Sequence, residues 1–192
     1  MVLALLHYKP LHPYGVQRLI KEWGKDQVVN VGQRTGLYRT IERLHADGLI
    51  TVKETGRDQA YPERTVYELT DAGRAAARRW LLTMLSTPKP EFPQFPAALS
   101  NLLMLTPEEI KSALGARLRA LTGTLAQLEA TLAAETARDL PRISLLEVEY
   151  LRTMTAAEIQ WVSSVLADLR AGRLDSSPEL LAAFDDEAPV VP

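Results

Sequence analysis

The chain of 192 residues contains no cysteine, only three histidines and no long hydrophobic run. Without cysteine it can form no disulfide, use no thiol in catalysis and bind no metal through thiolates. The first apolar run, Met1–Leu6, is too short for a signal peptide and has no basic flank. No stretch of about 20 apolar residues predicts a membrane span. We therefore expect a soluble, cytoplasmic protein that does not bind membranes.

The patterns on which most catalytic sites depend are missing too. The sequence has no Gly-rich phosphate loop, no Gly-x-Ser-x-Gly motif and no histidine after position 45. His7, His12 and His45 are not spaced as metal ligands on one helix, and no Asp cluster supports them. We expect neither an enzyme nor a metal or other cofactor, and we interpret His12 as a residue that orders its turn.

The charges are unevenly distributed along the chain. Apolar residues make up 46% of the sequence, which predicts an ordered core. Residues 1–80 hold 13 Lys and Arg against 9 Asp and Glu, a net charge of +4, whereas residues 81–192 hold 9 against 15, a net charge of −6. This asymmetry indicates two modules, the first of which acts near polyanions.

A basic amphipathic segment at residues 31–50 is the most informative feature. Leu37, Ile41 and Leu44 recur at the spacing of one apolar helix face. The opposite face carries Thr35, Arg39 and Arg43. The segment closes at Asp47-Gly48 and continues into an apolar strand. A short helix of this kind is typical of a DNA-reading element.

The first 85 residues predict three helices, a β-hairpin and a fourth helix. The helices are expected at Met1–Tyr8, Tyr14–Trp23 and Val31–Ala46, and the strands at Leu49–Thr55 and Arg64–Leu69. Thr70 is placed to cap the fourth helix, which runs to about Leu85. This is the layout of a winged helix, in which the third helix enters a major groove beside the hairpin.

The remaining residues predict a helical module behind a connector. Four prolines within residues 86–96 indicate a stiff, extended connector that no helix crosses. Residues 97–175 predict a short helix over 97–105, a long helix from Thr106 to about Leu140 and a last helix over 144–171. We expect the acidic tail, 176–192, to be frayed.

The long helix carries a leucine seam with steps of four and three residues, which is typical of coiled-coil packing. The seam consists of Leu114, Leu118, Leu121, Leu125, Leu128 and Leu132. Two such helices leave apolar surface uncovered when they pack on each other alone, so we expect a second copy of the chain to cover it. The alternative is a helical hairpin that lies on its own winged helix. The predicted fold is thus mainly α with a small hairpin wing: a winged helix-turn-helix domain, then a long-helix dimerisation domain.

Three segments in order resemble the signature of the PadR-type winged-helix transcriptional regulators. The first holds Leu6, Pro10, Leu11, His12 and Tyr14; the second holds Leu37-Tyr38, Leu44 and Asp47-Gly48-Leu49-Ile50; the third holds Tyr67, Leu69-Thr70 and Gly73-Arg74. Residues 91–170 also look like the helical C-terminal domain of one branch of that family.

The chain departs from the family pattern where two helices begin. Pro13 replaces the usual Gly, Gln33 takes the position of a helix-opening Ser, Thr35-Gly36 stands for Gly-Thr, and Arg39 replaces Pro. These differences concern the geometry of the helix starts and the bases that are read, not the fold. The resemblance implies a homodimeric repressor of one or a few promoters. In several relatives a small, often aromatic effector releases the DNA.

Arg39 and Arg43 are the leading candidates to read bases, because an arginine that projects from a helix in the groove can bind guanine through two hydrogen bonds. The alternative is that they are solvated charges paired with Glu42. Arg34 and Thr35 lie at the helix N-terminus, where backbone N–H groups attract phosphate. The other candidates for DNA contacts are Tyr14, Tyr38, which could instead pack on the core, and the wing residues Lys53, Arg57 and Arg64.

Five side chains are candidates for an effector pocket where the winged helix meets the dimer helices: Trp80, Phe92, Phe95, Met154 and Trp161. Aromatic side chains suit flat apolar ligands, although core and interface packing is the alternative. The predicted function is a sequence-specific, homodimeric repressor of an inverted-repeat operator in double-stranded DNA, released by a small aromatic effector. The alternative is a winged helix that binds proteins instead of DNA, which would suit an acidic third helix better than a basic one.

Overall fold

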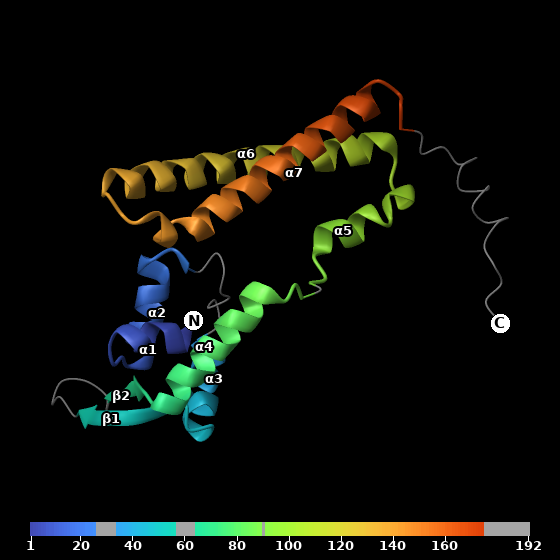
Figure 1. The fold of residues 1–192 in the computed structure, drawn as a ribbon. Coiled ribbons are helices and arrows are strands. Elements are labelled where there is room, and N and C mark those ends of the chain that lie inside the picture. The colour runs from blue at the N-terminus through green and yellow to red at the C-terminus, as the bar shows by residue number, and fades with distance from the viewer. Residues whose placement is uncertain (26–33, 57–63, 90, 175–192) are drawn as a thin grey trace, which may run out of the picture. The chain divides into compact units, whose positions relative to one another are not determined.

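The computed structural model describes residues 1–25, 34–56, 64–89 and 91–174 (Figure 1). The chain divides into two compact units, Met1–Glu91 and Phe92–Pro192. No helix in the described ranges is both long and apolar enough to cross a membrane. The elements found there are helices and one two-stranded antiparallel hairpin, which confirms the predicted mainly α fold class.

The first unit has the predicted order of helices and strands. Its helices are α1 (Val2–Tyr8), α2 (Pro13–Glu22), α3 (Arg34–Ala46) and α4 (Asp71–Ser86), and its strands are β1 (Ile50–Gly56) and β2 (Arg64–Leu69). The predicted start of the third helix at Val31 lies outside the described residues. Three helices followed by a hairpin form the expected winged helix.

One hydrophobic core holds the first unit together. Helices α1, α2 and α3 each supply an apolar face, and the two strands supply one buried residue each. The buried members are Val2, Leu3, Leu5, Leu6, Val16, Leu19, Ile20, Leu37, Ile41, Leu44, Ile50 and Leu69. Burial of one large aliphatic side chain contributes about 1.5–3 kcal/mol relative to exposure, so this core determines which face of α3 points outwards.

The wing is attached to the helices through its second strand. The strands pair with Ile50 opposite Leu69, and the register shifts between Val52 and Glu54. Leu11, in the loop between α1 and α2, exchanges two backbone hydrogen bonds of 3.0 Å with Tyr67 of β2. This loop therefore pairs with the hairpin and fixes the base of the wing to the helices.

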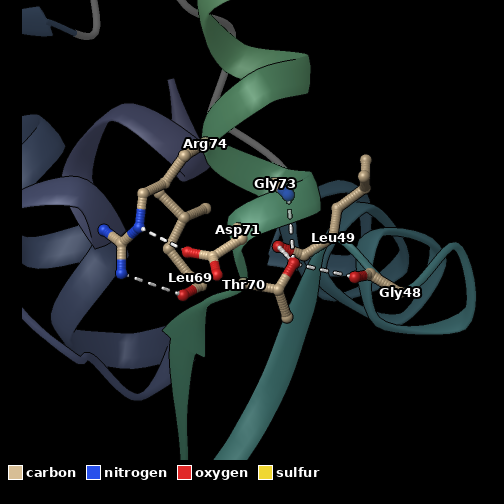
Figure 2. Close-up of polar contacts among 7 residues, drawn as sticks. All are labelled: Gly48, Leu49, Leu69, Thr70, Asp71, Gly73 and Arg74. Atoms are coloured by element: carbon tan, nitrogen blue, oxygen red, sulfur yellow. Dashed lines mark hydrogen bonds and ion pairs between the residues drawn. The ribbon is translucent and has the colours of Figure 1, made fainter.

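Thr70 joins the end of β2 and the start of α4 to the segment that follows α3 (Figure 2). Its Oγ1 accepts a hydrogen bond from the Gly73 N–H at 3.0 Å, which caps α4 as predicted. The same hydroxyl donates to the carbonyl oxygens of Gly48, at 2.8 Å, and Leu49, at 3.0 Å. The Thr70 N–H donates to Leu49 as well. We call this set of bonds the Thr70 junction.

Gly73 allows the first turn of α4 to lie against the backbone of Leu49. A Cβ atom at this position would overlap the Leu49 carbonyl oxygen and lie 2.8 Å from Leu69 Cδ1. The φ angle of Gly73 is an ordinary helical one, so space rather than backbone conformation requires the glycine.

The second unit is built from two long helices, α6 (Pro107–Ala137) and α7 (Leu146–Arg170), preceded by α5 (Gln94–Leu99). Short 3₁₀ turns lie at Leu102–Met104 and Arg142–Ser144. The buried side chains that join the helices are Ile110, Leu114, Val162, Leu166 and Leu169. The two helices therefore pack against each other within one chain.

Three expectations for the second unit were wrong in detail. Helix α5 begins at Gln94, inside the segment 86–96 that was expected to exclude helices, because Pro93 precedes the helix and Pro96 lies in its first turn, where no N–H is needed. The helix expected over 97–105 is split into α5 and a 3₁₀ turn, and α6 ends at Ala137 rather than Leu140.

The predicted start of α6 at Thr106 and Pro107 is confirmed as a complete capping box. Thr106 Oγ1 accepts from the Glu109 N–H at 3.3 Å, and Glu109 Oε2 accepts from the Thr106 N–H at 2.8 Å. The Thr106 N–H and the Thr106 hydroxyl, which also donates to Glu109 Oε2 at 2.8 Å, lower the pKa of Glu109 because both bonds favour its ionised carboxylate.

Replacement of the Thr70 hydroxyl tests the junction. We expect Thr70→Ala to lower the free energy of unfolding by about 1–2 kcal/mol, because it removes the cap of α4 and leaves the bonds to Gly48 and Leu49 unmade. Thr83→Ala, on the same helix, is the control: its exposed hydroxyl only donates to the Arg79 carbonyl, so its loss is expected to change stability little. Urea unfolding measures both, and equal effects would contradict the assigned role.

Substitution of Gly73 tests the close approach of α4 to Leu49. We expect Gly73→Ala to destabilise the chain by more than about 1 kcal/mol, since its Cβ collides with backbone that cannot move aside easily. Gly36→Ala in α3 has open space around the new Cβ and is expected to stabilise by about 0.5–1 kcal/mol. Thermal unfolding of both variants should therefore show shifts of opposite sign; a stabilised Gly73→Ala protein would refute the contact.

Candidate DNA interface

The outward face of α3 is basic, and the one ion pair described for its two arginines is a long one. Leu37, Ile41 and Leu44 fix the helix on the core, and Arg39 and Arg43 are exposed on the other side. The Arg43 side chain is 85% exposed, and its Nε lies 3.9 Å from Asp47 Oδ2, at the outer limit of an ion pair.

Glu42 was the alternative partner for these two arginines. Among the described residues Arg39 makes no ion pair, and Glu42 pairs with neither arginine. Arg39 and Arg43 therefore present two largely unneutralised guanidinium groups on a rigid helix, which is the geometry that base readout requires.

One flank of α3 adjoins the wing, and the other is polar. His45 packs edge-on against Tyr67 of β2, with 5.7 Å between the ring centroids. Tyr38 is 46% exposed, so its side chain is neither a core residue nor fully solvated. On the opposite flank the Thr40 hydroxyl donates to the Gly36 carbonyl at 2.8 Å. The contact between His45 and Tyr67 joins α3 to the hairpin.

The start of α2 presents Tyr14 to solvent. His12 is the N-cap of α2, and its Nδ1 accepts from the Gly15 N–H at 2.9 Å, which confirms that His12 orders its turn. Pro13, a departure from the family pattern, occupies the first helical position, where a missing N–H costs nothing. The Tyr14 ring stacks on His12 at 6.1 Å, and 56% of the residue is exposed. Its position suits a phosphate contact.

The remaining candidates are described only in part. Arg34 and Thr35 form the first turn of α3, and Arg64 begins β2, but their side chains lie outside the described residues, as does the whole of Arg57. Lys53 is half-exposed on β1, with its Nζ 3.8 Å from Glu68 Oε2 across the hairpin. An exposed pair of this kind is weak and leaves Lys53 able to reach a phosphate.

The leucine seam of α6 is used largely inside its own chain. Leu114 and Leu128 are buried, and Leu118 and Leu121 pack partly against the core formed with α7. Leu125 and Leu132 are half-buried. The spacing of the seam is that of a helix contact, but α7 of the same chain already supplies much of its partner surface.

A second apolar row, which the sequence reading missed, lies exposed on α7. It consists of Leu146, Tyr150, Met154 and Trp161, which are 47%, 64%, 52% and 45% exposed. At about 100° per residue these positions fall on one side of the helix, away from the buried Val162, Leu166 and Leu169. The steps of four between the first three were the available signal. We call these four residues the α7 stripe.

The five candidates for an effector pocket lie in different parts of the structure. Trp80 lies on α4 in the first unit and is 47% exposed. In the second unit, Phe95 packs edge-on against Trp161 at 6.0 Å, and Phe92 is 96% exposed. The Arg117 guanidinium covers the Phe95 ring at 3.5 Å and pairs with Glu158. Phe95 and Trp161 thus form an aromatic pair, whereas Phe92 contacts little.

No group of three or more His, Asp or Glu side chains in the described part of the chain is arranged to hold a metal ion. The exposed side of the winged helix carries the cationic groups of Arg39, Arg43 and Lys53. Chemically, such a surface binds phosphates and the acceptor edges of bases.

Comparisons with known proteins agree with this geometry. Residues 2–79 match the model of the transcriptional regulator PadR-like family. No curated protein matches the chain. Among solved structures, PadR of Bacillus subtilis in complex with operator DNA has a TM-score of 0.73 and 21% identity, and covers 88% of this chain and 96% of that chain.

Two further structures are similar. PadR of Bacillus subtilis in complex with p-coumaric acid has a TM-score of 0.70 and 20% identity, with 88% of this chain and 96% of that chain covered. The virulence activator AphA of Vibrio cholerae has a TM-score of 0.63 and 21% identity, with 88% and 95% covered. These similarities show the fold, and the matched residues cover parts of both units.

The family match spans α1 to the first half of α4, including all three sequence segments that resemble the family signature. This family comprises transcriptional regulators rather than enzymes. The chain therefore carries a domain of the PadR-like family of transcriptional regulators.

Proposed function

We propose that this protein is a homodimeric transcriptional repressor that acts in the cytoplasm and binds an inverted-repeat operator. The observation that carries the proposal is the outward face of α3, where Arg39 and Arg43 project from a helix whose other side is locked into the core. Its fold is that of a protein solved in complex with operator DNA, PadR of Bacillus subtilis.

In this proposal α3 lies in a major groove and the wing lies beside it. Arg39 and Arg43 read base edges, each through a planar fork that matches two acceptors of guanine. Phosphate contacts come from residues around them: Tyr14, Arg34, Thr35, Tyr38, Lys53, Arg57 and Arg64. These contacts position the helix but carry no sequence information of their own.

The second copy of the chain binds through the second unit. The four large apolar side chains of the α7 stripe are about half exposed in the single chain, and a monomer gains no stability from exposing them. A dimer that covers the stripe, together with Leu125 and Leu132 at the accessible part of the seam, buries this surface in an isologous interface. An inverted repeat with half-sites one DNA turn apart requires the two α3 helices of this dimer to lie about 34 Å apart.

The effector of this repressor is a small aromatic molecule. The chain has exposed aromatic side chains in both units, and the B. subtilis protein of similar fold has been solved with p-coumaric acid, an aromatic acid. A ligand that binds the DNA-free conformation better shifts the equilibrium away from the operator complex by that difference in affinity.

Loss of the two arginines tests the DNA-reading face. The operator is first selected from a random DNA pool with the wild-type protein. Arg39→Ala and Arg43→Ala are then each expected to weaken binding to it by about 10–100-fold, because each good bidentate contact is worth about 1–3 kcal/mol. Arg119→Ala, on the exposed surface of α6, is the matched control and should bind normally. Fluorescence anisotropy at fixed salt measures the affinity.

The salt dependence of binding separates this function from a protein-binding winged helix. Specific binding should weaken steeply as salt rises. Failure to select any sequence, or unchanged affinity after loss of Arg39 and Arg43 together, would reject the repressor in favour of a module that binds protein.

Charge on the α7 stripe tests the dimer. Tyr150→Glu combined with Met154→Glu would place carboxylates in the proposed interface, and we expect the protein to sediment as a monomer, since the cost of burying a charge exceeds what the interface gains. Ser163→Glu, exposed on another side of α7, should leave the dimer intact. Analytical ultracentrifugation over a concentration series measures the shift. A dimer that tolerates both stripe carboxylates would show that the chains meet elsewhere.

A further inference from the structure

Glu42 places a carboxylate on the side of α3 that faces away from the core. At about 100° per residue, Glu42 and Arg43 fall on opposite sides of Arg39, each within about 60° of it. The Glu42 residue is exposed, as are the two arginines. A DNA groove that α3 enters with its arginines therefore receives this carboxylate as well.

The carboxylate of Glu42 has no partner among the described residues. It takes part in none of the ion pairs of the winged helix, although Arg39 lies three residues before it and Arg43 directly follows it. Other carboxylates of the same unit do pair with basic side chains: Glu22, Asp47, Glu68 and Asp71. The oxygens of Glu42 are thus open to a bound molecule.

An unpaired carboxylate on this surface limits what the surface can bind. An ionised Glu side chain only accepts hydrogen bonds, whereas a phosphate offers no donor and repels its charge. Among the groups that bases present in the major groove, the donors are the N4 amino group of cytosine and the N6 amino group of adenine. Glu42 therefore gains a hydrogen bond in the groove only where a base presents an amino group.

Cytosine suits a carboxylate better than adenine does. The N6 amino group of adenine lies beside N7, an acceptor that repels a carboxylate and that suits the amide of Asn or Gln. Cytosine presents its N4 amino group without an acceptor of its own in the groove. The two arginines beside Glu42 offset its repulsion from the phosphates, so the helix can still approach the DNA.

We propose that Glu42 is a specificity-determining residue, which accepts a hydrogen bond from the N4 amino group of a cytosine in the major groove, close to the guanines that Arg39 and Arg43 read. This inference rests on the proposed function, to which it adds the class of base. The arginines supply affinity and select guanine. Glu42 contributes little affinity and excludes other bases at one position of each half-site.

Base-by-base binding measurements on the selected operator test the role of Glu42. Each base pair of a half-site is changed in turn, and fluorescence anisotropy at fixed salt gives the affinity. The wild type is expected to prefer cytosine at one position by about 5–100-fold, the usual effect of one wrong base pair. Glu42→Ala should lose the preference at this position alone and keep those that Arg39 and Arg43 impose.

Glu42→Gln is the second variant, because an amide can bond both N6 and N7 of adenine. Its preference at the same position is expected to change from cytosine to adenine, which a merely structural role of Glu42 would not produce. Thermal unfolding midpoints of both variants should stay near that of the wild type, since Glu42 is exposed and makes no bond that the variants would remove.

Glu54→Ala is the matched control, because it removes the same charge from an exposed position on β1 that forms no ion pair with a described residue. It should keep the cytosine preference. A uniform rise in affinity for all sequences in Glu42→Ala, with every preference unchanged, would overturn the inference and make Glu42 a solvated charge. Loss of the same preference in Glu54→Ala would overturn it too, as a general electrostatic effect.

The arginine variants separate failure of this inference from failure of the proposed function. The cytosine preference is expected to survive in Arg39→Ala and in Arg43→Ala, although both bind more weakly. An operator whose binding depends on the arginines, but whose base preferences survive Glu42→Ala, would refute the role of Glu42 and leave the repressor standing. Failure to select any operator would refute both.

Discussion

The hydroxyl of Thr70 is the point on which the geometry of the winged helix depends. It caps α4 through the Gly73 N–H and at the same time bonds the carbonyl groups of Gly48 and Leu49, which follow α3. One side chain therefore joins the connection between β2 and α4 to the segment after α3, which lies 21 to 22 residues earlier in the sequence. Each bond alone contributes little net free energy, but a missing one would leave a backbone group unsatisfied at the junction.

The position of α3 follows from this junction and from the core. The apolar face of the helix is held on α1 and α2, the segment after it is held by Thr70, and His45 meets Tyr67 of the wing. With three sides fixed, the remaining face of α3 must point to solvent. The helix that carries the arginines is positioned by packing, and the one ion pair described there, Arg43 with Asp47, is long and exposed, so it neutralises little of their charge.

Local patterns predicted the elements well, because each element has a signal of its own. The apolar period of residues 37–44 located α3, Thr106 and Pro107 located the start of α6, and Thr70 located the start of α4. The prolines misled where they were read as helix breakers only, since Pro96 lies in the first turn of α5.

Properties that depend on the packing of two distant segments could not be predicted from the sequence. A leucine seam shows that a helix has a partner but not which helix it is, and here α7 of the same chain covers much of it. The α7 stripe is visible as a spacing only once the buried side of that helix is known.

The use of the leucine seam within one chain has a consequence for how the protein assembles. Since α6 and α7 satisfy much of each other's apolar surface, a newly made chain can complete its second unit before it meets a partner. For the dimer proposed above, folding is then a first-order event, and association is a separate, concentration-dependent step between finished surfaces. Subunits of that proposed dimer can exchange at low abundance without unfolding, so the cellular level of the protein would set how much of it is paired.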